Sequence, residues 1–245
     1  MLISAAVCPH PPFLVPEASG APGSADAELD RLRAACHAAV ATLTAERPDV
    51  IAVVGGAAQT AQYPPQATGS LREFGIPFTV GEDSQRPPVL PLSLTIGRWL
   101  LSSAPLSSGP LSSDGAQART LWGIRSGAPA AECLDLGDKL AALAPRVALL
   151  AMGDGPGRRA RGVPGTADAA ADRYDAQVAA ALAAPSPRAL AALDPDQDDD
   201  LFIAGRAAWQ VLAGAAGHDD YDAVLAYAGA PFEVTYFVAT WHRAH

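Results

Sequence analysis

Chemically active side chains first appear where the opening apolar run ends. Residues 2–7 are apolar apart from one serine, and His10 follows with Pro9, Pro11 and Pro12 around it. Proline restricts its own backbone and that of the residue before it, so these prolines hold the imidazole on a stiff, extended segment. An imidazole in such a position can serve as a metal ligand or an acid–base group. The alternative is a loop histidine that hydrogen-bonds to a backbone carbonyl.

A second chemically suggestive segment, GDGPGRRARG, covers residues 153–162 and follows the apolar run 147–152. Its glycines can turn backbone N–H groups toward a ligand, and its arginines, beginning with Arg158, add positive charge. Such a loop between a strand and a helix can bind an anion, although it lacks the Gly-Lys-Ser/Thr of a P-loop. Asp154, Gly155 and Arg158 are therefore candidate binding residues. The alternatives are a solvated basic loop and, for Asp154, a carboxylate that caps the following turn.

Three short apolar runs are predicted to be the strands that position these residues. They cover residues 2–7, 49–54 and 147–152, and Gly55-Gly56 is expected to end the second. A helix ending near Glu46 joins the first two runs, and this order predicts parallel pairing in a right-handed unit. Ligands in open α/β sheets bind outside the carboxyl ends of the strands. We therefore expect His10, Gly55, Gly56 and Asp154 to line one crevice, with Glu233 nearby.

The remaining elements complete an α/β pattern. Helices are expected over 92–101, 138–144 and 166–184, and strands over 77–80, 120–124, 223–228 and 234–241, the last two forming a hairpin. The acidic run 194–200 is predicted to lie at the N-terminus of a helix over 201–216, because carboxylates are favourable there. It lacks the glycine and final glutamate of an EF-hand loop.

Together these elements predict a three-layer α/β/α fold with a central, mostly parallel but mixed sheet. One domain is expected to span residues 1–245, with a flexible Ser/Pro/Gly excursion around 102–115.

Composition narrows the function classes. The formal net charge of −9 argues against a nucleic-acid surface, which normally shows a basic patch. Three isolated cysteines form neither a disulfide framework nor a zinc motif. The N-terminus lacks a signal peptide pattern, and no apolar stretch approaches the length of a membrane span. We expect a cytoplasmic protein without nucleic-acid or membrane partners, and its oligomeric state stays open.

Several segments together resemble the class III (LigB-type) extradiol ring-cleavage dioxygenases and the related MEMO-like proteins. Residues 8–17, CPHPPFLVPE, resemble the opening of that family, and residues 231–236, PFEVTY, resemble its closing strand. Gly153-Asp154, with Arg158 and then Tyr174-Asp175, resembles a Gly-Asp-x-x-His-Arg segment followed by an aromatic–Asp pair. The resemblance spans nearly the full chain. It implies a LigB/MEMO-like fold and Fe(II)-dependent opening of catechols by O₂ in aromatic compound catabolism.

The resemblance also implies a ligand set from which this sequence departs. The family holds iron with two histidines and a carboxylate, and a further histidine acts as acid–base catalyst. His10 matches the first ligand and Glu233 is the candidate carboxylate, although alignment through Pro231-Phe232 would place the family's glutamate at Gly229. No histidine occurs at residues 55–58, where the second ligand would fall, or at Gly157, where the catalytic histidine would fall.

Three functions follow as hypotheses. The first is a divergent extradiol dioxygenase, an oxidoreductase using Fe(II) at His10 and Glu233, with ring cleavage weak or lost. The second is a protein with no metal cofactor that binds a small aromatic or anionic molecule on the same fold, through Gly55, Gly56 and the segment from Asp154 to Arg158. The third is a structural or regulatory subunit, expected if side chains fill the crevice. His37, His218, His242 or His245 would have to supply any substitute ligand.

Overall fold

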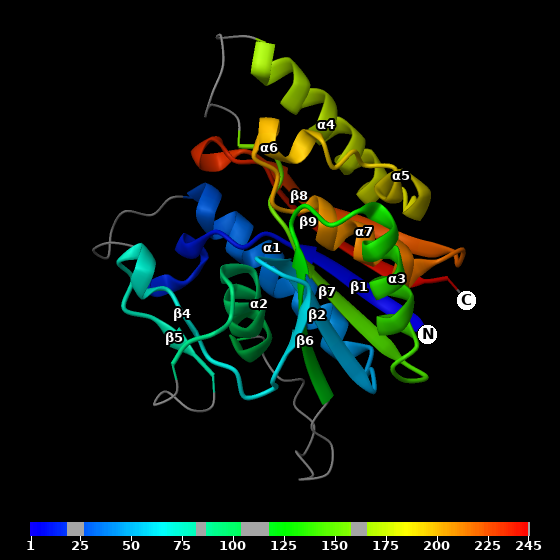
Figure 1. Cartoon of the computed structure of the whole chain (residues 1–245), viewed down its shortest axis with the longest axis horizontal. Coiled ribbons are helices and arrows are strands. Elements are labelled where there is room, and N and C mark those ends of the chain that lie inside the picture. The colour runs from blue at the N-terminus through cyan, green and yellow to red at the C-terminus, as the bar shows by residue number, and fades with distance from the viewer. Residues whose placement is uncertain (19–26, 82–86, 104–117, 158–165, 245) are drawn as a thin grey trace.

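The computed structural model describes residues 1–18, 27–81, 87–103, 118–157 and 166–244 (Figure 1). Seven strands form the main sheet, in the order β3-β6-β2-β7-β1-β9-β8. Their bounds are β1 Leu2–Cys8, β2 Val50–Ala57, β3 Ala61–Tyr63, β6 Ala118–Arg125, β7 Val147–Met152, β8 Tyr221–Gly229 and β9 Tyr236–Arg243. A separate small sheet pairs β4, Gly69–Ser70, with β5, Thr79–Val80.

Four neighbouring strands form the parallel centre of the main sheet. Strands β6, β2, β7 and β1 pair in parallel, whereas β3, β9 and β8 pair antiparallel to their neighbours. The three runs predicted as strands, at 2–7, 49–54 and 147–152, are therefore adjacent in one sheet. Because parallel strands end at the same edge, their carboxyl ends lie together. The predicted mostly parallel, mixed sheet is confirmed.

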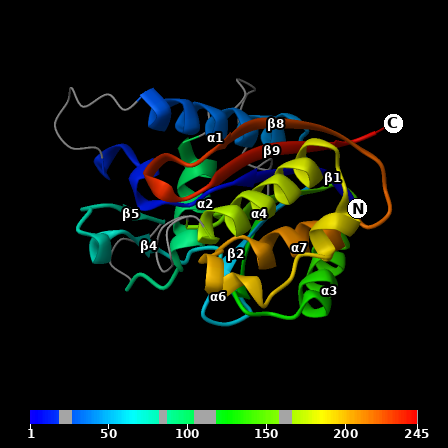
Figure 2. The ribbon, with the colours of Figure 1, turned by 90° about the horizontal axis from the view of Figure 1, so that it is seen from above.

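Helices cover both faces of this sheet (Figure 2). Helix α1, Ala27–Ala45, and helix α2, Leu92–Ser103, pack on one face. The other face carries α3 Ala130–Ala141, α4 Thr166–Ala183, α5 Pro187–Ala191, α6 Gln197–Leu201 and α7 Arg206–Ala216. Along β2, Ile51 and Val53 pack under α1 and α2, while Ala52 and Val54 pack on the α7 side, as the period of two in a strand requires. The three-layer α/β/α architecture is confirmed.

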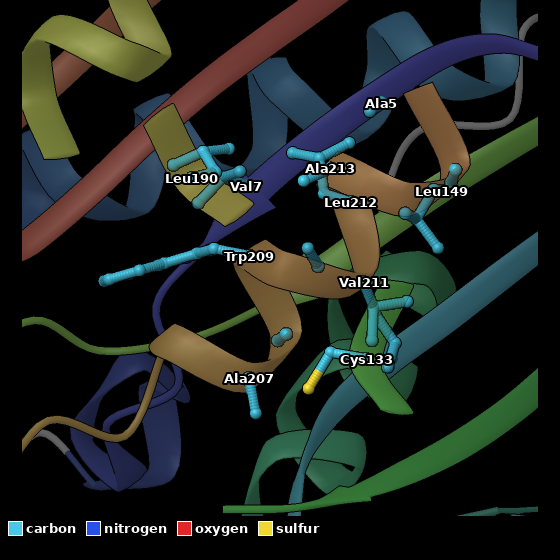
Figure 3. Close-up of a cluster of buried hydrophobic side chains, with 14 of the residues drawn as sticks. Ala5, Val7, Cys133, Leu149, Leu190, Ala207, Trp209, Val211, Leu212 and Ala213 are labelled. Atoms are coloured by element: carbon cyan, nitrogen blue, oxygen red, sulfur yellow. The ribbon is translucent and has the colours of Figure 1, made fainter. Parts of the chain in front are cut away.

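Helix α7 is the buried centre of its layer, with every one of its residues buried. Its side chains meet residues from β1, β7, α3 and α5, among them Val7, Leu149, Cys133 and Leu190 (Figure 3). Arg206 and Gln210 lie one turn apart in this apolar setting and hydrogen-bond to each other at 2.6 Å. A helix buried on all sides needs such polar groups to be satisfied internally.

Two predicted boundaries in this layer are wrong. Helix α3 begins at Ala130, directly after Pro129, and not near residue 138. The acidic run does not lead into one helix over 201–216, because residues 197–201 form the separate short helix α6. Phe202 ends α6 with a left-handed φ of 54°, and α7 begins at Arg206. Asp198 of α6 pairs with Arg206 at 2.6 Å, so this carboxylate serves a buried arginine as well as a helix end.

Boundaries near the predicted site also differ. Strand β2 continues through Gly55 and Gly56 to Ala57, because these residues stay in register with Gly123–Arg125 of β6. Strands β8 and β9 form the predicted antiparallel pair, but β9 begins at Tyr236, so Glu233 lies in the connection, within the 3₁₀ turn η4, Pro231–Glu233.

The predicted excursion at 102–115 begins inside α2, which includes Ser102 and Ser103, and its remainder lies outside the described residues. Among the described helices, none is long and apolar enough to cross a membrane.

Candidate functional site

Strands β1 and β7 end side by side and bring His10 to Asp154. Cys8 pairs with Met152 in the parallel register, and the Gly153 N–H donates to the Cys8 carbonyl at 2.9 Å. The His10 backbone N–H donates to Asp154 Oδ1 at 2.8 Å, and the same oxygen lies 3.5 Å from His10 Nδ1. The two side chains are only 9% and 15% exposed. Two residues predicted to share a crevice thus form a nearly buried imidazole–carboxylate pair.

The electrostatics of this pair suit proton handling. Burial raises the pKa of Asp154 above its usual range, and the positive charge and backbone N–H of His10 oppose that rise. His10 Nδ1 is buried and makes no hydrogen bond with the described residues, since the 3.5 Å approach to Asp154 lacks hydrogen-bond geometry. A carboxylate beside an imidazole orients the ring and stabilises its protonated form. The pair can therefore hold a proton or bind a polar group of a ligand.

Two residues that sequence reasoning missed lie close to Asp154. Burial raises the pKa of the Cys36 thiol on α1, and neighbouring Cys8 and the Asp154 carboxylate add to the rise. Burial likewise raises the pKa of Tyr236 at the start of β9, again with a contribution from Asp154. Both side chains stay protonated at neutral pH and form an apolar wall. No sequence motif marks them, because their proximity to Asp154 arises only when α1 and β9 pack on the sheet.

Gly55 and Gly56 lie at the same edge, but the space beside them is filled. A Cβ placed on Gly55 would lie 2.6 Å from both Cβ and Oγ of Ser93, in the first turn of α2. Ser93 Oγ also donates to the Gly56 carbonyl at 2.7 Å. A Cβ on Gly56 would meet Ser126 Oγ at 3.4 Å. A histidine at residue 55 would therefore require α2 to move, so Gly55 serves close helix–sheet packing, whereas Gly56 has room for a Cβ.

Glu233 occupies a different environment from the His10–Asp154 pair. It is exposed and has a left-handed φ of 66° in the connection between β8 and β9. The rings of Phe232 and Phe13 pack edge to face with centroids 4.7 Å apart, and the centroids of Phe13 and Tyr236 are 6.1 Å apart. This connection therefore lies beside the segment that follows His10. Within the described residues, however, no three His, Cys, Asp or Glu side chains gather closely enough to hold a metal ion.

The remaining described histidines do not complete a ligand set. His37 on α1 packs against Trp99 of α2, with ring centroids 5.4 Å apart. His218 is exposed after α7, and His242 lies 3.5 Å from Glu46 near the end of β9. His242 pairs in register with Ser4, near the opposite end of β1 from His10. The two-histidine, one-carboxylate arrangement therefore does not fit the described residues.

The glycines of the segment 153–157 use their N–H groups inside the protein. In addition to the bond from Gly153, Gly155 N donates to Thr235 O at 2.8 Å and Gly157 N to Leu201 O at 2.9 Å. The prediction that these N–H groups face an anion is wrong, because β1, the connection before β9, and α6 supply their acceptors. Arg158, the predicted cationic member of this segment, lies outside the described residues. Asp175 of the predicted aromatic–Asp pair accepts a hydrogen bond from Thr235 Oγ1 at 2.8 Å.

An Asp154→Asn substitution tests the electrostatics of the pair. A group whose pKa is raised on folding contributes stability below its unfolded pKa of about 3.9, and that contribution is lost as the pH rises through the folded pKa. We therefore expect the free energy of unfolding of the wild type, relative to Asp154→Asn, to fall as the pH rises above about 4. Urea unfolding at a series of pH values measures this difference. A difference that stays constant or grows with pH would contradict the raised pKa.

Comparisons with known proteins add a structural likeness and no family. No family model matches the chain, and no curated protein matches it. Among solved structures, the chain is similar to an uncharacterized protein from Escherichia coli K12, with 17% sequence identity and a TM-score of 0.49. The alignment covers 98% of this chain and 99% of that one.

Proposed function

We propose that this chain is a divergent LigB-like protein that binds a small aromatic or anionic molecule beside His10 and Asp154. We further propose that it does not hold Fe(II) through two histidines and a carboxylate, and that its cleavage of catechols is weak or absent. The observation that carries the proposal is that His10 pairs with the buried carboxylate of Asp154, while no three His, Cys, Asp or Glu side chains of the described residues gather closely enough to hold a metal ion.

The surroundings of His10 support the loss of iron chemistry. A ring-cleaving iron site must hold the metal and still leave positions free for substrate and oxygen. Here Asp154 Oδ1 already accepts the His10 backbone N–H, and Ser93 fills the space at Gly55, the first of the residues 55–58 within which the resemblance places the second histidine. The resemblance also places the acid–base histidine at Gly157. Loss of an acid–base group alone typically costs a factor of about 10² to 10⁴ in rate.

The same surroundings support binding of a small acidic or phenolic molecule. The imidazole can donate a hydrogen bond to a phenolate or carboxylate, and His10 Nδ1, unpaired among the described residues, is available for such a contact. Phe13, which is partly exposed and packs on the buried Tyr236 ring, supplies aromatic surface near this edge. Sites for small molecules commonly combine apolar lining with a few placed polar groups.

A structural or regulatory subunit is the second candidate. The His10 and Asp154 side chains are only 9% and 15% exposed, and Ser93 packs against Gly55. Such filling leaves little accessible surface at the carboxyl edge of β1 and β2. Under this alternative His10 and Asp154 serve to join β1 to β7, and no small molecule reaches them.

One set of measurements separates these functions. The protein is loaded anaerobically with Fe(II), its bound iron is determined by elemental analysis, and oxygen consumption is followed with catechol and protocatechuate. Binding of protocatechuate to the metal-free protein is measured by calorimetry. We expect bound iron well below one per chain, no oxygen uptake above that of His10→Ala, and protocatechuate binding that His10→Ala weakens about tenfold through loss of one charged hydrogen bond.

His218→Ala is the matched control, because His218 is exposed and remote from the pair in the fold. It should leave iron content, oxygen uptake and binding unchanged. Stoichiometric iron with robust oxygen uptake that His10→Ala abolishes would overturn the proposal in favour of an active dioxygenase. Absence of protocatechuate binding, together with loss of stability in His10→Ala, would favour the structural subunit.

A further inference from the structure

Helices α4 and α6 lie on the face of the sheet opposite to α1 (Figure 2). Residues of both helices line a cleft. Its volume is about 440 Å³. One wall presents Arg173 and Gln177 from α4, and the other presents Gln197 and Asp200 from α6, with an alanine and a leucine between them. These residues recur at spacings of three and four, so each helix turns one continuous face to the cleft. The acidic run 194–200, which the sequence analysis predicted only to lie at a helix N-terminus, thus also forms one wall of the cleft.

A buried hydroxyl without a partner lies in this cleft. Tyr174 lines the cavity although the residue is only 2% exposed, and its hydroxyl makes no hydrogen bond with any described residue. A buried hydroxyl left unpaired typically costs about 1–3 kcal/mol, so such groups normally have a protein, water or ligand partner. Burial raises the pKa of Tyr174, and the Asp198 carboxylate adds to the rise, so the hydroxyl stays neutral in a negative local potential.

The charges of the two walls define what the cleft can recognise. Arg173 and Asp200 carry opposite charges on facing helices, and neither forms an ion pair within the described residues. A guanidinium binds a carboxylate through paired hydrogen bonds, whereas a carboxylate and a neutral phenol oxygen accept from an ammonium group. The amides of Gln177 and Gln197 offer both donors and acceptors to a polar side chain.

We propose that this cleft binds a small zwitterion of the polar α-amino-acid class. The ligand carboxylate pairs with Arg173, and its ammonium group donates to the Tyr174 hydroxyl oxygen and to Asp200. The cavity volume of about 440 Å³ accommodates a molecule of this size. The site is separate from the His10–Asp154 pair, which lies at the carboxyl ends of β1 and β7, so this binding does not depend on the function proposed there.

Saturation-transfer NMR with the full chain tests the proposal, using L-glutamine and L-serine in millimolar excess. N-acetyl-L-glutamine, which lacks the ammonium group, and L-glutamine methyl ester, which lacks the carboxylate, are measured in parallel. We expect at least one free amino acid to bind and both modified forms to lose binding. Tyr174→Phe should weaken binding about fivefold and Arg173→Ala about tenfold or more, as expected for loss of a neutral and a charged hydrogen bond.

Arg188→Ala, an exposed substitution on α5 outside the cleft, is the matched control and should bind like the wild type. Tyr174→Phe keeps the ring and removes an unpaired hydroxyl, so its thermal unfolding should be unchanged or shifted upward, which separates a binding loss from misfolding. Failure of both amino acids to bind would overturn the proposal. So would binding that survives in Tyr174→Phe and Arg173→Ala, or equal binding of the modified forms.

Discussion

Replacing Arg206 with methionine is expected to lower the free energy of unfolding by about 3–5 kcal/mol, the usual cost of removing one member of a buried ion pair. Arg206 is 1% exposed, and its Nε lies 2.6 Å from Asp198 Oδ2. Its other nitrogens donate to the carbonyls of Ser126 and Ala128 and to Gln210 Oε1, at 2.6, 3.0 and 2.6 Å. Methionine fills a similar volume but leaves all four acceptors without this donor.

The loss should also depend on pH. Burial raises the pKa of Asp198 to about 6 even with Arg206 beside it. Removing the guanidinium raises the pKa of Asp198 further. Over the pH range between the two pKa values, Asp198 is therefore neutral in the variant and charged in the wild type. A raised folded pKa means stability that is lost as the pH rises, and in the variant this loss continues to a higher pH. The stability gap between the two proteins should therefore widen as the pH rises above about 6.

Equilibrium urea unfolding at pH 5 and pH 8 measures both effects. Arg243→Met is the matched control, because Arg243 pairs with Asp219 at 2.8 Å while the two side chains are 31% and 42% exposed. Exposed pairs contribute roughly 0–1 kcal/mol. A loss in Arg206→Met no larger than that of the control, or equal at both pH values, would show that the buried network is not a stabilising centre.

A single methyl group at Gly137 is expected to destabilise the protein by about 3 kcal/mol, near the upper end of the cost of overpacking a core. A Cβ on Gly137 of α3 would lie 2.1 Å from Val211 O and 2.5 Å from Ala215 N, both backbone atoms of α7. A Cβ on Gly214 of α7 would lie 2.2 Å from Leu134 O of α3. The two helices therefore touch backbone to backbone, and neither can yield by rotating a side chain.

The sign of this prediction separates packing from helix propensity. In an exposed helix, glycine to alanine stabilises by about 1 kcal/mol, so propensity alone predicts a gain. We expect Gly137→Ala and Gly214→Ala each to lower the urea midpoint instead. Gly127→Ala is the control, because its Cβ would meet only Arg125 Nη1, at an ordinary 3.6 Å. A stabilised Gly137→Ala would mean that α3 and α7 separate easily.

Much of the fold could be predicted from local pattern. The short, largely apolar runs at 2–7 and 147–152 have few alternatives to buried strands, and the helix between the first two strands requires a parallel crossover. That order also placed His10 and Asp154 at one edge, because parallel strands share the edge at which they end. The predicted ends of helices and strands were wrong where a partner elsewhere in the chain determines the end. Strand β2 passes Gly55-Gly56 because β6 continues beside it, and no local signal reports that.

The candidate site shows what only the tertiary structure decides. The histidines missing at residues 55–58 and at Gly157 are facts of the sequence, and they argue against an iron triad by themselves. That Ser93 closes the space at Gly55, and that the Thr235 carbonyl accepts the Gly155 N–H, depended on segments far away in the chain.

The pairing of Asp198 with Arg206 and the α4–α6 cleft likewise depended on the tertiary structure. Residue type and spacing determine which groups are present and at which end of a strand they lie. Which of them remain free to meet a ligand is determined by packing, because most buried donors and acceptors take a partner that the folded chain supplies.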